Sequence, residues 1–420
     1  MIDMLLVGLG ALLIAAGVFD IVATVLHPEV ESQVSSRFQQ GIWWALRGIH
    51  ALTPRRPDGF NLLTWGVPLM VAGLIALWLA LFTVGFALIY TPWIGNGAYF
   101  SSSTAISPTF SSALYFSGVT TATLGYGDIL PVVPVFRGLA VLQALLGTIT
   151  VAFSVSYLLA LYPALTRRRQ VATALDAEVA GQASALPMLR RYLGNGVGWD
   201  NQLTKRLREL ALELLAITES HEQHAVLYYA HTRRVQHSLL RLLVIARNLV
   251  AALRYTLSPD QHRALVFHPD LIALEQSLHY SLRRFSGSLH LPSPQAHGDG
   301  QSRNSLEREF ATQQAALQQI GLNVHVASER AVPVLVESRI EHGSDDEPPQ
   351  QRQAHSVASS NGQALDPAND LRSASALEAY ITFRRQVDPH IAAYAHVIGY
   401  KLEDANADYD SIWWTGDREL

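Results

Sequence analysis

The chain of 420 residues contains no cysteine, which excludes disulfide bonds and thiolate metal sites. Charged side chains are also scarce, at 16% of the residues, and their distribution is uneven. Between Asp58 and Arg167 the only charged residues are Asp128 and Arg137. A net charge of −4 argues against general nucleic-acid binding. The first part of the chain therefore has the composition of a membrane protein, and most charges belong to a second, polar part.

Three apolar stretches reach the roughly 20 residues that a helix needs to cross a bilayer. They run over about residues 5–25, 62–90 and 135–162. The first stretch has no basic segment before it and no small-residue cleavage site after it, so it is interpreted as a span rather than a signal peptide. The predicted fold class is an all-α membrane protein with three transmembrane helices, followed by a mainly helical polar region.

Arginine positions predict the orientation of the spans. Arg37, Arg47, Arg55 and Arg56 lie between the first two stretches, and three further arginines follow the last one at residues 167–169. Because positive loops stay on the cytoplasmic side, both regions are expected there. The N-terminus is then outside, and the polar C-terminal region is cytoplasmic. The expected location is the cell (inner) membrane.

The uncharged stretch between the second and third spans is too apolar for an exposed loop, so it is expected to re-enter the membrane. Ser107 and Pro108 indicate the start of a short helix that reaches about Thr121. Gly125 and Gly127 then permit backbone angles that turn successive carbonyls to one side. Irregular backbone at membrane depth survives only where protein buries it or water lines it. A row of carbonyl oxygens facing one way is a cation-binding site.

The sequence "TLGYGD" at residues 123–128 resembles the selectivity filter of tetrameric potassium channels. The resemblance covers residues 62–165, and Arg137 and Gly147 stand where simple bacterial members carry an arginine and a hinge glycine. It implies a pore domain with K⁺ as the permeant ion, no other cofactor, and a homotetramer, because four copies are needed to complete a ring of ligands. A single filter copy distinguishes the chain from potassium transporters that carry four repeats.

The resemblance also implies roles for individual residues. K⁺ ligands would be the backbone carbonyls of Thr123, Leu124, Gly125 and Tyr126 with the Thr123 hydroxyl, and the segment would end with Gly127 and with Asp128 at the outer mouth. Tyr126 would pack behind the filter against an aromatic cuff of Tyr115 and Phe116. Leu124 replaces the usual valine or isoleucine. Val119 replaces a glutamate that pairs with the filter aspartate, so the Tyr115 hydroxyl is the expected partner of Asp128.

Several residues outside the filter have open interpretations. Gly147 is either a gating hinge or a close-packing position, and Leu159 with Pro163 is a candidate inner gate, the filter itself being the alternative. Asp20, an ionisable group inside the first span, is either functional or bonded to Thr24 or an arginine. Trp43 and Trp44 predict an amphipathic helix that anchors at the membrane interface.

The polar region is predicted to form helices over about residues 203–217, 225–257, 270–285, 306–319 and 376–402. The resulting domain organisation is an N-terminal helix and interfacial helix at 1–61, the pore domain at 62–165, a helical cytoplasmic domain at 166–285, a linker at 286–304, a cytoplasmic helix at 305–341, a disordered stretch at 342–370, and a C-terminal helix and tail at 371–420. No nucleotide-binding fold or voltage sensor is recognisable, so the regulator is unidentified.

One polar cluster stands out in the cytoplasmic region. His221 and His224 are three residues apart, with Glu219 and His231 nearby, which would place the two histidines on one helix face. The cluster could sense protons or bind a metal, and a hydrogen-bonded helix junction is the favoured alternative. The predicted function is a potassium-selective channel and not an enzyme. The alternative is a non-conducting membrane sensor or scaffold whose cytoplasmic helices bind a partner.

Overall fold

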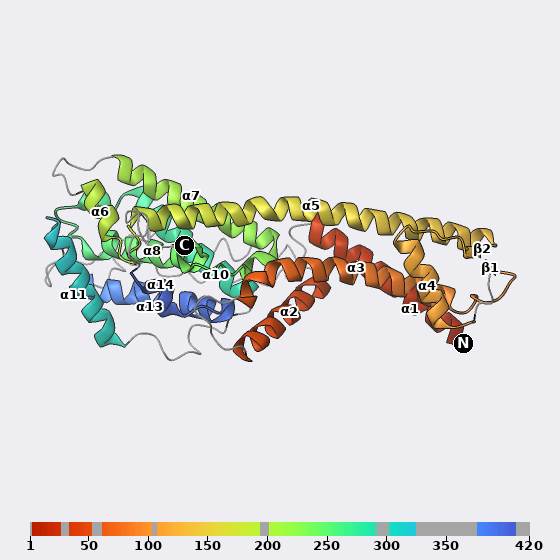
Figure 1. Ribbon diagram of the computed structural model, residues 1–420. Coiled ribbons are helices and arrows are strands. Elements are labelled where there is room, and N and C mark those ends of the chain that lie inside the picture. Colours follow the sequence, from red (N-terminus) through yellow and green to blue (C-terminus); the bar gives the residue numbers. More distant parts are fainter. Residues whose placement is uncertain are drawn as a thin grey trace, which may run out of the picture.

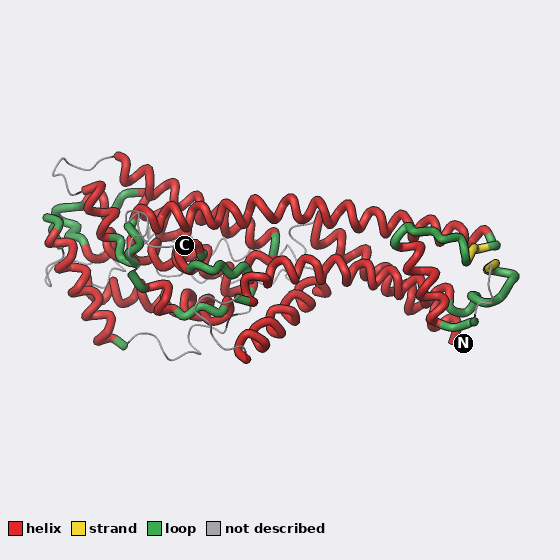
Figure 2. The backbone as a smooth tube through the Cα atoms, in the orientation of Figure 1, coloured by secondary structure: helices red, strands yellow, loops and turns green. Residues whose placement is uncertain are grey.

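The structure is a computed structural model, and it describes residues 2–26, 33–52, 61–102, 107–193, 201–289, 291, 302–324 and 376–408. The chain forms an elongated, almost entirely helical molecule (Figures 1 and 2). A single long helix, α5 (Pro134–Glu178), runs along most of it and joins a narrow apolar part to a wider polar part. The predicted disordered stretch 342–370 lies outside the described residues.

Among the residues that the structure describes, three helices are long and apolar enough to cross a membrane, which confirms the predicted spans. They are α1 (Ile2–Ile21), which continues as the π-helical turn η1 (Val22–Leu26); α3 (Gly66–Tyr90), preceded by the 3₁₀ turn η2 (Leu62–Trp65); and α5. α1 packs closely on α3, because Gly10 and Gly85 leave no room for side chains. A Cβ on Gly10 would lie 2.4 Å from the Gly85 carbonyl oxygen. Small residues at such a contact let two membrane helices approach closely.

α2 (Gln33–Leu52) is the predicted amphipathic helix, but its two tryptophans differ in their surroundings. Trp44 is exposed, as expected for an interfacial anchor, whereas Trp43 is buried. The Trp43 ring lies 5.4 Å from the ring of Tyr229, and its indole N–H donates to the carbonyl of Val397 at 2.9 Å. The partners of Trp43 belong to the polar part of the protein, so Trp44 is the tryptophan of this helix that stays available for an interface.

α5 does not end where its apolar sequence ends. It continues through Pro163 to Glu178, so the predicted domain boundary at 165/166 falls inside an unbroken helix. At about 1.5 Å per residue the helix is about 67 Å long. One stripe of it is buried along the whole length, from Phe136 through Gln143, Tyr157 and Arg168 to Asp176. The polar half of the helix is therefore held in place by its own buried residues.

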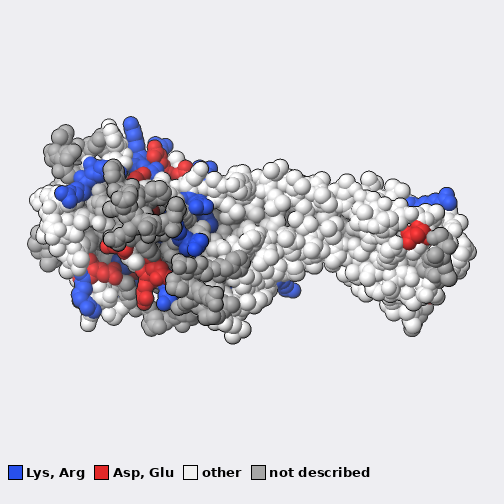
Figure 3. Space-filling view, viewed as in Figure 1, with Lys and Arg blue, Asp and Glu red and all other residues white. Residues whose placement is uncertain are grey.

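The polar part, here called the helical domain, packs around α8 (Leu239–Val250), which is buried at every position except Asn248. Its other elements are α6 (Leu186–Leu193), α7 (Asn201–Gln223), η3 (Ala225–Tyr229), η4 (Val235–His237), η5 (Ala251–Thr256), α9 (Arg263–Val266), α10 (Pro269–Ser288), α11 (Arg303–Gln319), α13 (Ala376–Ile398) and α14 (Leu402–Asn406). Figure 3 shows charges gathered on this domain and a broad uncharged surface along the apolar part.

Two helix predictions in this domain need correction. The single helix predicted over 225–257 is divided into η3, η4, α8 and η5, and Ser238 caps α8 by accepting from the N–H of Arg241. The helix predicted over 376–402 ends at Ile398, because Gly399 adopts a φ of +78° that terminates the helix. The predicted linker at 286–304 is shorter than expected, since α10 continues to Ser288 and α11 begins at Arg303.

Candidate functional site

The site lies where the chain returns from α4 (Phe110–Thr121) to α5 at the end of the molecule remote from the helical domain (Figure 1). α4 is the short helix predicted between the second and third spans. Its N-cap is Thr109, whose hydroxyl accepts from the Ser112 N–H at 3.4 Å. The predicted start at Ser107 and Pro108 is therefore two residues too early, because the cap that satisfies a helical N–H is Thr109.

α4 ends in a hydrogen-bonded cap that also begins the segment 123–128, here called the glycine segment. The N–H of Leu124 donates to the carbonyl of Val119 at 2.9 Å, and the N–H of Thr123 donates to that of Thr120 at 3.0 Å. This pair of bonds is the Schellman arrangement, which needs a residue with positive φ after the helix. That residue is Thr123, with φ +55°. A β-branched residue in this region is strained, and such strain is typical of functional sites.

The glycine segment continues with alternating backbone angles. Gly125 and Gly127 have φ of +57° and +77°, while Leu124, which precedes Gly125, and Tyr126, which lies between the two glycines, keep negative φ. In a regular strand successive carbonyls point to opposite sides, whereas alternation between left- and right-handed conformations turns them toward one side. A Cβ on Gly125 or Gly127 would meet nothing within 4 Å, so glycine is required here by its backbone angle and not by lack of space.

Residues after the glycine segment form a short two-stranded ladder that the sequence did not indicate. β2 (Ile129–Pro131) pairs antiparallel with β1 (Phe100–Ser102), with Ser101 opposite Leu130. The Arg137 guanidinium donates to the carbonyl of Pro131 at 3.0 Å and so ties the ladder to the first turns of α5. On the other side of the segment, the Tyr115 hydroxyl donates to the Asp128 carboxylate at 2.8 Å, which is the pairing expected from the sequence.

The C-terminal end of α4 is fixed to α5 by Gln143. Its side-chain amide nitrogen donates to the Ser117 carbonyl, the Ser117 hydroxyl and the Thr121 hydroxyl, at distances of 2.6–2.8 Å. The Ser117 hydroxyl in turn donates to the carbonyl of Thr83 on α3 at 2.6 Å. Sequence reasoning missed Gln143, although a single amide in an apolar span was a usable signal. One polar network thus joins α3, α4 and α5 close to the start of the glycine segment.

Gly147 lies at the same contact. A Cβ there would come within 2.2 Å of the Thr121 carbonyl oxygen. Only glycine at position 147 therefore allows α5 to approach the end of α4 this closely. α5 is continuous at this position. Of the two interpretations left open for Gly147, close packing is the one that the described contacts favour.

The glycine segment is open on one side of the single chain. Leu124 is 58% exposed and Tyr126 is 67% exposed. A cavity of about 150 Å³ lies behind the segment, lined by Tyr126, Tyr115 and Phe116 among others. The expectation that Tyr126 packs against these two rings is therefore not met in the single chain, because a hollow lies between them.

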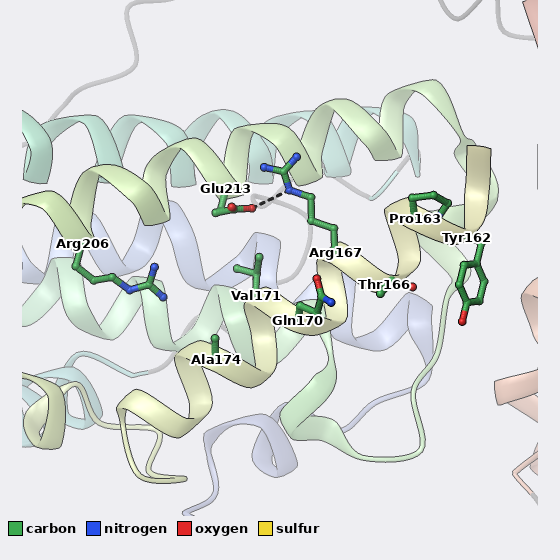
Figure 4. A pocket seen from close by; sticks show the side chains of 9 residues that line it. All are labelled: Tyr162, Pro163, Thr166, Arg167, Gln170, Val171, Ala174, Arg206 and Glu213. Atoms are coloured by element: carbon green, nitrogen blue, oxygen red, sulfur yellow. Dashed lines mark hydrogen bonds and ion pairs between the residues drawn. The ribbon is translucent and has the colours of Figure 1, made fainter. Parts of the chain in front are cut away.

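The candidate inner gate lies in the second half of α5. Pro163 has no N–H, so the carbonyl of Leu159, four residues earlier, lacks its usual helical donor. Leu159 is 70% exposed. Pro163 also borders a groove of about 750 Å³ between α5 and α7, where Arg167 and Glu213 form an ion pair of 2.9 Å (Figure 4). The two candidate gate residues therefore stand at the junction of the apolar part and the helical domain.

Asp20 is fully buried at the end of α1 and holds three helices together. Its carboxylate accepts from the indole N–H of Trp78 at 2.6 Å and from the backbone N–H of Ser35 at 3.1 Å, with a further bond from the Ser35 hydroxyl. Of the two partners considered from the sequence, Thr24 donates to the Ser35 hydroxyl at 3.2 Å and so stands next to the same group of bonds. Asp20 thereby attaches the start of α2 to α1 and α3.

The histidine cluster does not form the predicted helix face. α7 ends at Gln223, and His224 precedes η3 with a non-helical backbone. His221 is buried with its ring against Tyr228 and Phe285, and its Nδ1 lies 2.7 Å from the Ile217 carbonyl oxygen. His224 contacts Tyr157 of α5 edge-on at 5.4 Å.

Burial, with a smaller contribution from Arg168, lowers the pKa of His221 to about 3, so the ring is neutral near pH 7. Burial also lowers the pKa of His224, and that of His231 to about 4. In the part of the chain that the structure describes, no group of three or more His, Asp or Glu side chains could hold a metal ion. The contacts favour the third interpretation of the cluster, a hydrogen-bonded helix junction.

Arg168 is a further residue that sequence reasoning did not single out, being one of three consecutive arginines. It is 2% exposed on α5, and its guanidinium donates to the carbonyls of Ala230 at 3.0 Å and Leu227 at 3.4 Å. The two neighbouring arginines are exposed, which only the helix periodicity of a continuous α5 could have revealed.

Comparison with known proteins agrees with this location of the site. Residues 73–162 match the sequence pattern of a family described as "Ion channel". The chain is also 23% identical over 259 residues to the uncharacterized membrane protein YdjJ of Bacillus subtilis (strain 168), an alignment that spans 62% of this chain and 72% of that protein. No solved structure matches the chain. The family match contains α4, the glycine segment and the apolar half of α5, and it supports an ion-channel pore domain in this part of the protein.

Proposed function

We propose that the protein is a potassium-selective channel that conducts K⁺ passively through a homotetrameric pore. One observation carries the proposal: Thr123, Gly125 and Gly127 alternate in positive φ within an uncharged segment between two membrane-spanning helices. Such alternation supports a row of carbonyl oxygens that face one side. Carbonyl oxygens arranged in this way replace the hydration shell of K⁺ in the known filters of potassium channels.

The proposed ligands are the carbonyls of Thr123, Leu124, Gly125 and Tyr126 with the Thr123 hydroxyl. One chain supplies one side of an ion site, so four copies around an axis would complete it. The open face of the glycine segment, where Leu124 and Tyr126 are more than half exposed, is the face that such an assembly would cover. In the tetramer the hollow beside Tyr126 would be closed by a neighbouring subunit.

The contacts around the segment suit this role because they fix its two ends. The Schellman cap and the Gln143 network hold the inner end, and the bond from Tyr115 to Asp128 holds the outer end. The negative end of the α4 dipole points toward the same inner side and favours a cation there. A rigid ring of carbonyls needs such support to keep its spacing around the ion.

Orientation and gate belong to the same proposal. The arginines at 37 and 47 and at 167–169 favour a cytoplasmic position for α2 and the helical domain, with the N-terminus outside and the protein in the cell membrane. Four α5 helices could then converge near Leu159 and Pro163, where the helix lacks one hydrogen bond and can bend.

The test is ion flux into liposomes that contain the purified protein. We expect K⁺ uptake well above Na⁺ uptake, carried by a tetramer in native mass spectrometry. Gly125→Ala should abolish K⁺ uptake while leaving the tetramer intact. The matched control is Gly138→Ala, since a Cβ at either position meets nothing within 4 Å but only Gly125 has positive φ.

Equal uptake of the two cations would contradict potassium selectivity. Unchanged uptake in Gly125→Ala would show that the glycine segment is not the filter. Absence of any cation flux from a well-folded tetramer would favour a membrane sensor or scaffold instead.

A further inference from the structure

The C-terminal end of α13 meets the helix α2 at a single backbone oxygen. The carbonyl of Val397 accepts from the Trp43 indole at 2.9 Å and from the Arg47 guanidinium at 3.3 Å. Carbonyls in the last turn of a helix have no intrahelical donor, and cations are favourable at that end. α2 thus supplies two donors to one of these end carbonyls, although Trp43 and Val397 are 354 positions apart in the chain.

The next residues extend this contact. Gly399, with φ +78°, comes so close to η2 that a Cβ there would lie 2.9 Å from a methyl group of Leu63. The Tyr400 hydroxyl donates to the Thr232 carbonyl at 2.8 Å and accepts from the Thr232 N–H at 2.8 Å. The Tyr400 ring stacks on His231 with centroids 4.2 Å apart. Residues 397–400 are here called the α13 joint.

The same loop that Tyr400 holds is also bonded to α5. Arg168 donates to the carbonyls of Leu227 and Ala230, which lie five and two residues before Thr232. Because Arg168 is buried, these bonds are shielded from water and hold the loop firmly. The loop 227–232 is therefore fixed to α5 on one side and to the α13 joint on the other.

α2 in turn is attached to the membrane helices. Ser35 near its start is bonded to Asp20 of α1, and the same carboxylate accepts from Trp78 of α3. A continuous series of contacts therefore leads from α1 and α3 through α2, the α13 joint and the loop 227–232 to α5.

We propose that the α13 joint is a mechanical coupling that sets the position of the polar half of α5 relative to α2. α5 has lost one hydrogen bond at Pro163, five residues before Arg168, so a displacement of Arg168 would bend the helix at that point. A movement of α13 would in this way reach the pore-lining helix. The consequence for conduction rests on the proposed channel function, whereas the coupling itself does not.

The test compares two adjacent tryptophans. Trp43→Phe removes the indole N–H that binds Val397 and keeps an aromatic ring, and Trp44→Phe removes the equivalent N–H from the exposed neighbour. Since the chain has no cysteine, Ile49→Cys on α2 and Gln170→Cys on α5 provide two exposed, unique sites for spin labels. Labelled subunits are diluted with unlabelled ones, so that the measured distance lies within one subunit.

We expect Trp43→Phe to broaden or shift the α2–α5 distance distribution and to change K⁺ flux several-fold, and Trp44→Phe to change neither. Tyr400→Phe, which removes the hydroxyl from Thr232, should act like Trp43→Phe. If the distance distribution is unchanged in both Trp43→Phe and Tyr400→Phe, the coupling is refuted, whatever the flux. If the distribution changes while wild type passes no K⁺, the channel function fails and the coupling stands. If it changes while a K⁺-selective flux stays constant, the joint does not control conduction and the proposal is overturned in that respect.

Discussion

The Tyr115 hydroxyl and the Asp128 carboxylate, 2.8 Å apart, join the middle of α4 to the last residue of the glycine segment. Asp128 is one of two charged residues between Asp58 and Arg167. Removal of the hydroxyl by Tyr115→Phe should loosen the segment and lower K⁺ flux through liposomes several-fold, with a smaller K⁺ preference over Na⁺. Asp128→Asn keeps an acceptor oxygen and should be milder than Asp128→Ala. Equal fluxes in wild type and Tyr115→Phe would show that the bond is dispensable.

Gly147→Ala places a methyl group against the Thr121 carbonyl oxygen, where an ideal Cβ lies at 2.2 Å. Since backbone cannot yield as a flexible side chain can, we expect a loss of about 1–3 kcal/mol in stability. The measurement is thermal unfolding of the protein in detergent. Gly138→Ala, which meets open space in the subunit, is the control and should unfold like wild type. A Gly147→Ala protein of full stability but altered flux would instead favour the hinge interpretation.

His221 makes the stability of the helical domain depend on pH in a defined direction. Its pKa is about 3 in the folded protein, and an unperturbed histidine has a pKa of about 6.5. Below about pH 6.5 this histidine binds a proton in the unfolded chain but not in the folded protein. As the pH falls, the free energy of unfolding therefore decreases by about 1.4 kcal/mol per pH unit for this group. Above that pH the contribution is complete and constant.

The check is denaturant unfolding of wild type and His221→Gln at several pH values. The variant should show a shallower loss of stability between pH 6.5 and 5, and the two proteins should run parallel between pH 7 and 8. Parallel curves over the whole range would mean that His221 is not held neutral by burial. Because the ring stays uncharged in the folded protein, a pH response of conduction between 5.5 and 8 is not expected to arise from it.

Arg241 links α5 to the far end of the chain. Its fully buried guanidinium donates to Asp176 of α5 at 2.8 Å and to the carbonyls of Ala405 and Ala407 at 2.8 Å. Arg241→Met should destabilise the helical domain by about 3–5 kcal/mol, because it leaves a buried carboxylate without its partner. Adding Asp176→Leu should restore part of the loss. If the double variant is less stable than the single one, the ion pair itself is not the source of the effect.

The spans and the glycine segment could be predicted from sequence because their causes are local. Apolar length determines a membrane helix, and the two glycines determine the backbone angles at 125 and 127. The extension of α5 beyond Tyr162 could not be predicted from apolar length, because charged residues begin at Arg167. The helix is continued there by contacts such as that of Arg241 with Asp176.

Other features depend on partners that are distant in the chain. Nothing near residues 225–238 marks the end of a helix, and the carbonyls of Leu227 and Ala230 are directed instead to Arg168. Trp43 has the position of a lipid anchor on an amphipathic helix, but its partner is Val397. The β1–β2 ladder is too short to show alternation. Gly399, by contrast, is a helix end that a glycine in the sequence could have indicated.

Thr123 completes the cap of α4 and is also the first residue of the glycine segment. The chain therefore has no spacer between the two. Inserting or deleting one residue between Val119 and Gly125 would move each carbonyl into its neighbour's place and put the glycines out of phase with the turns that need them. We therefore expect a change in length here to disrupt the segment, whereas a side-chain substitution such as Leu124→Val leaves the glycines at their positions.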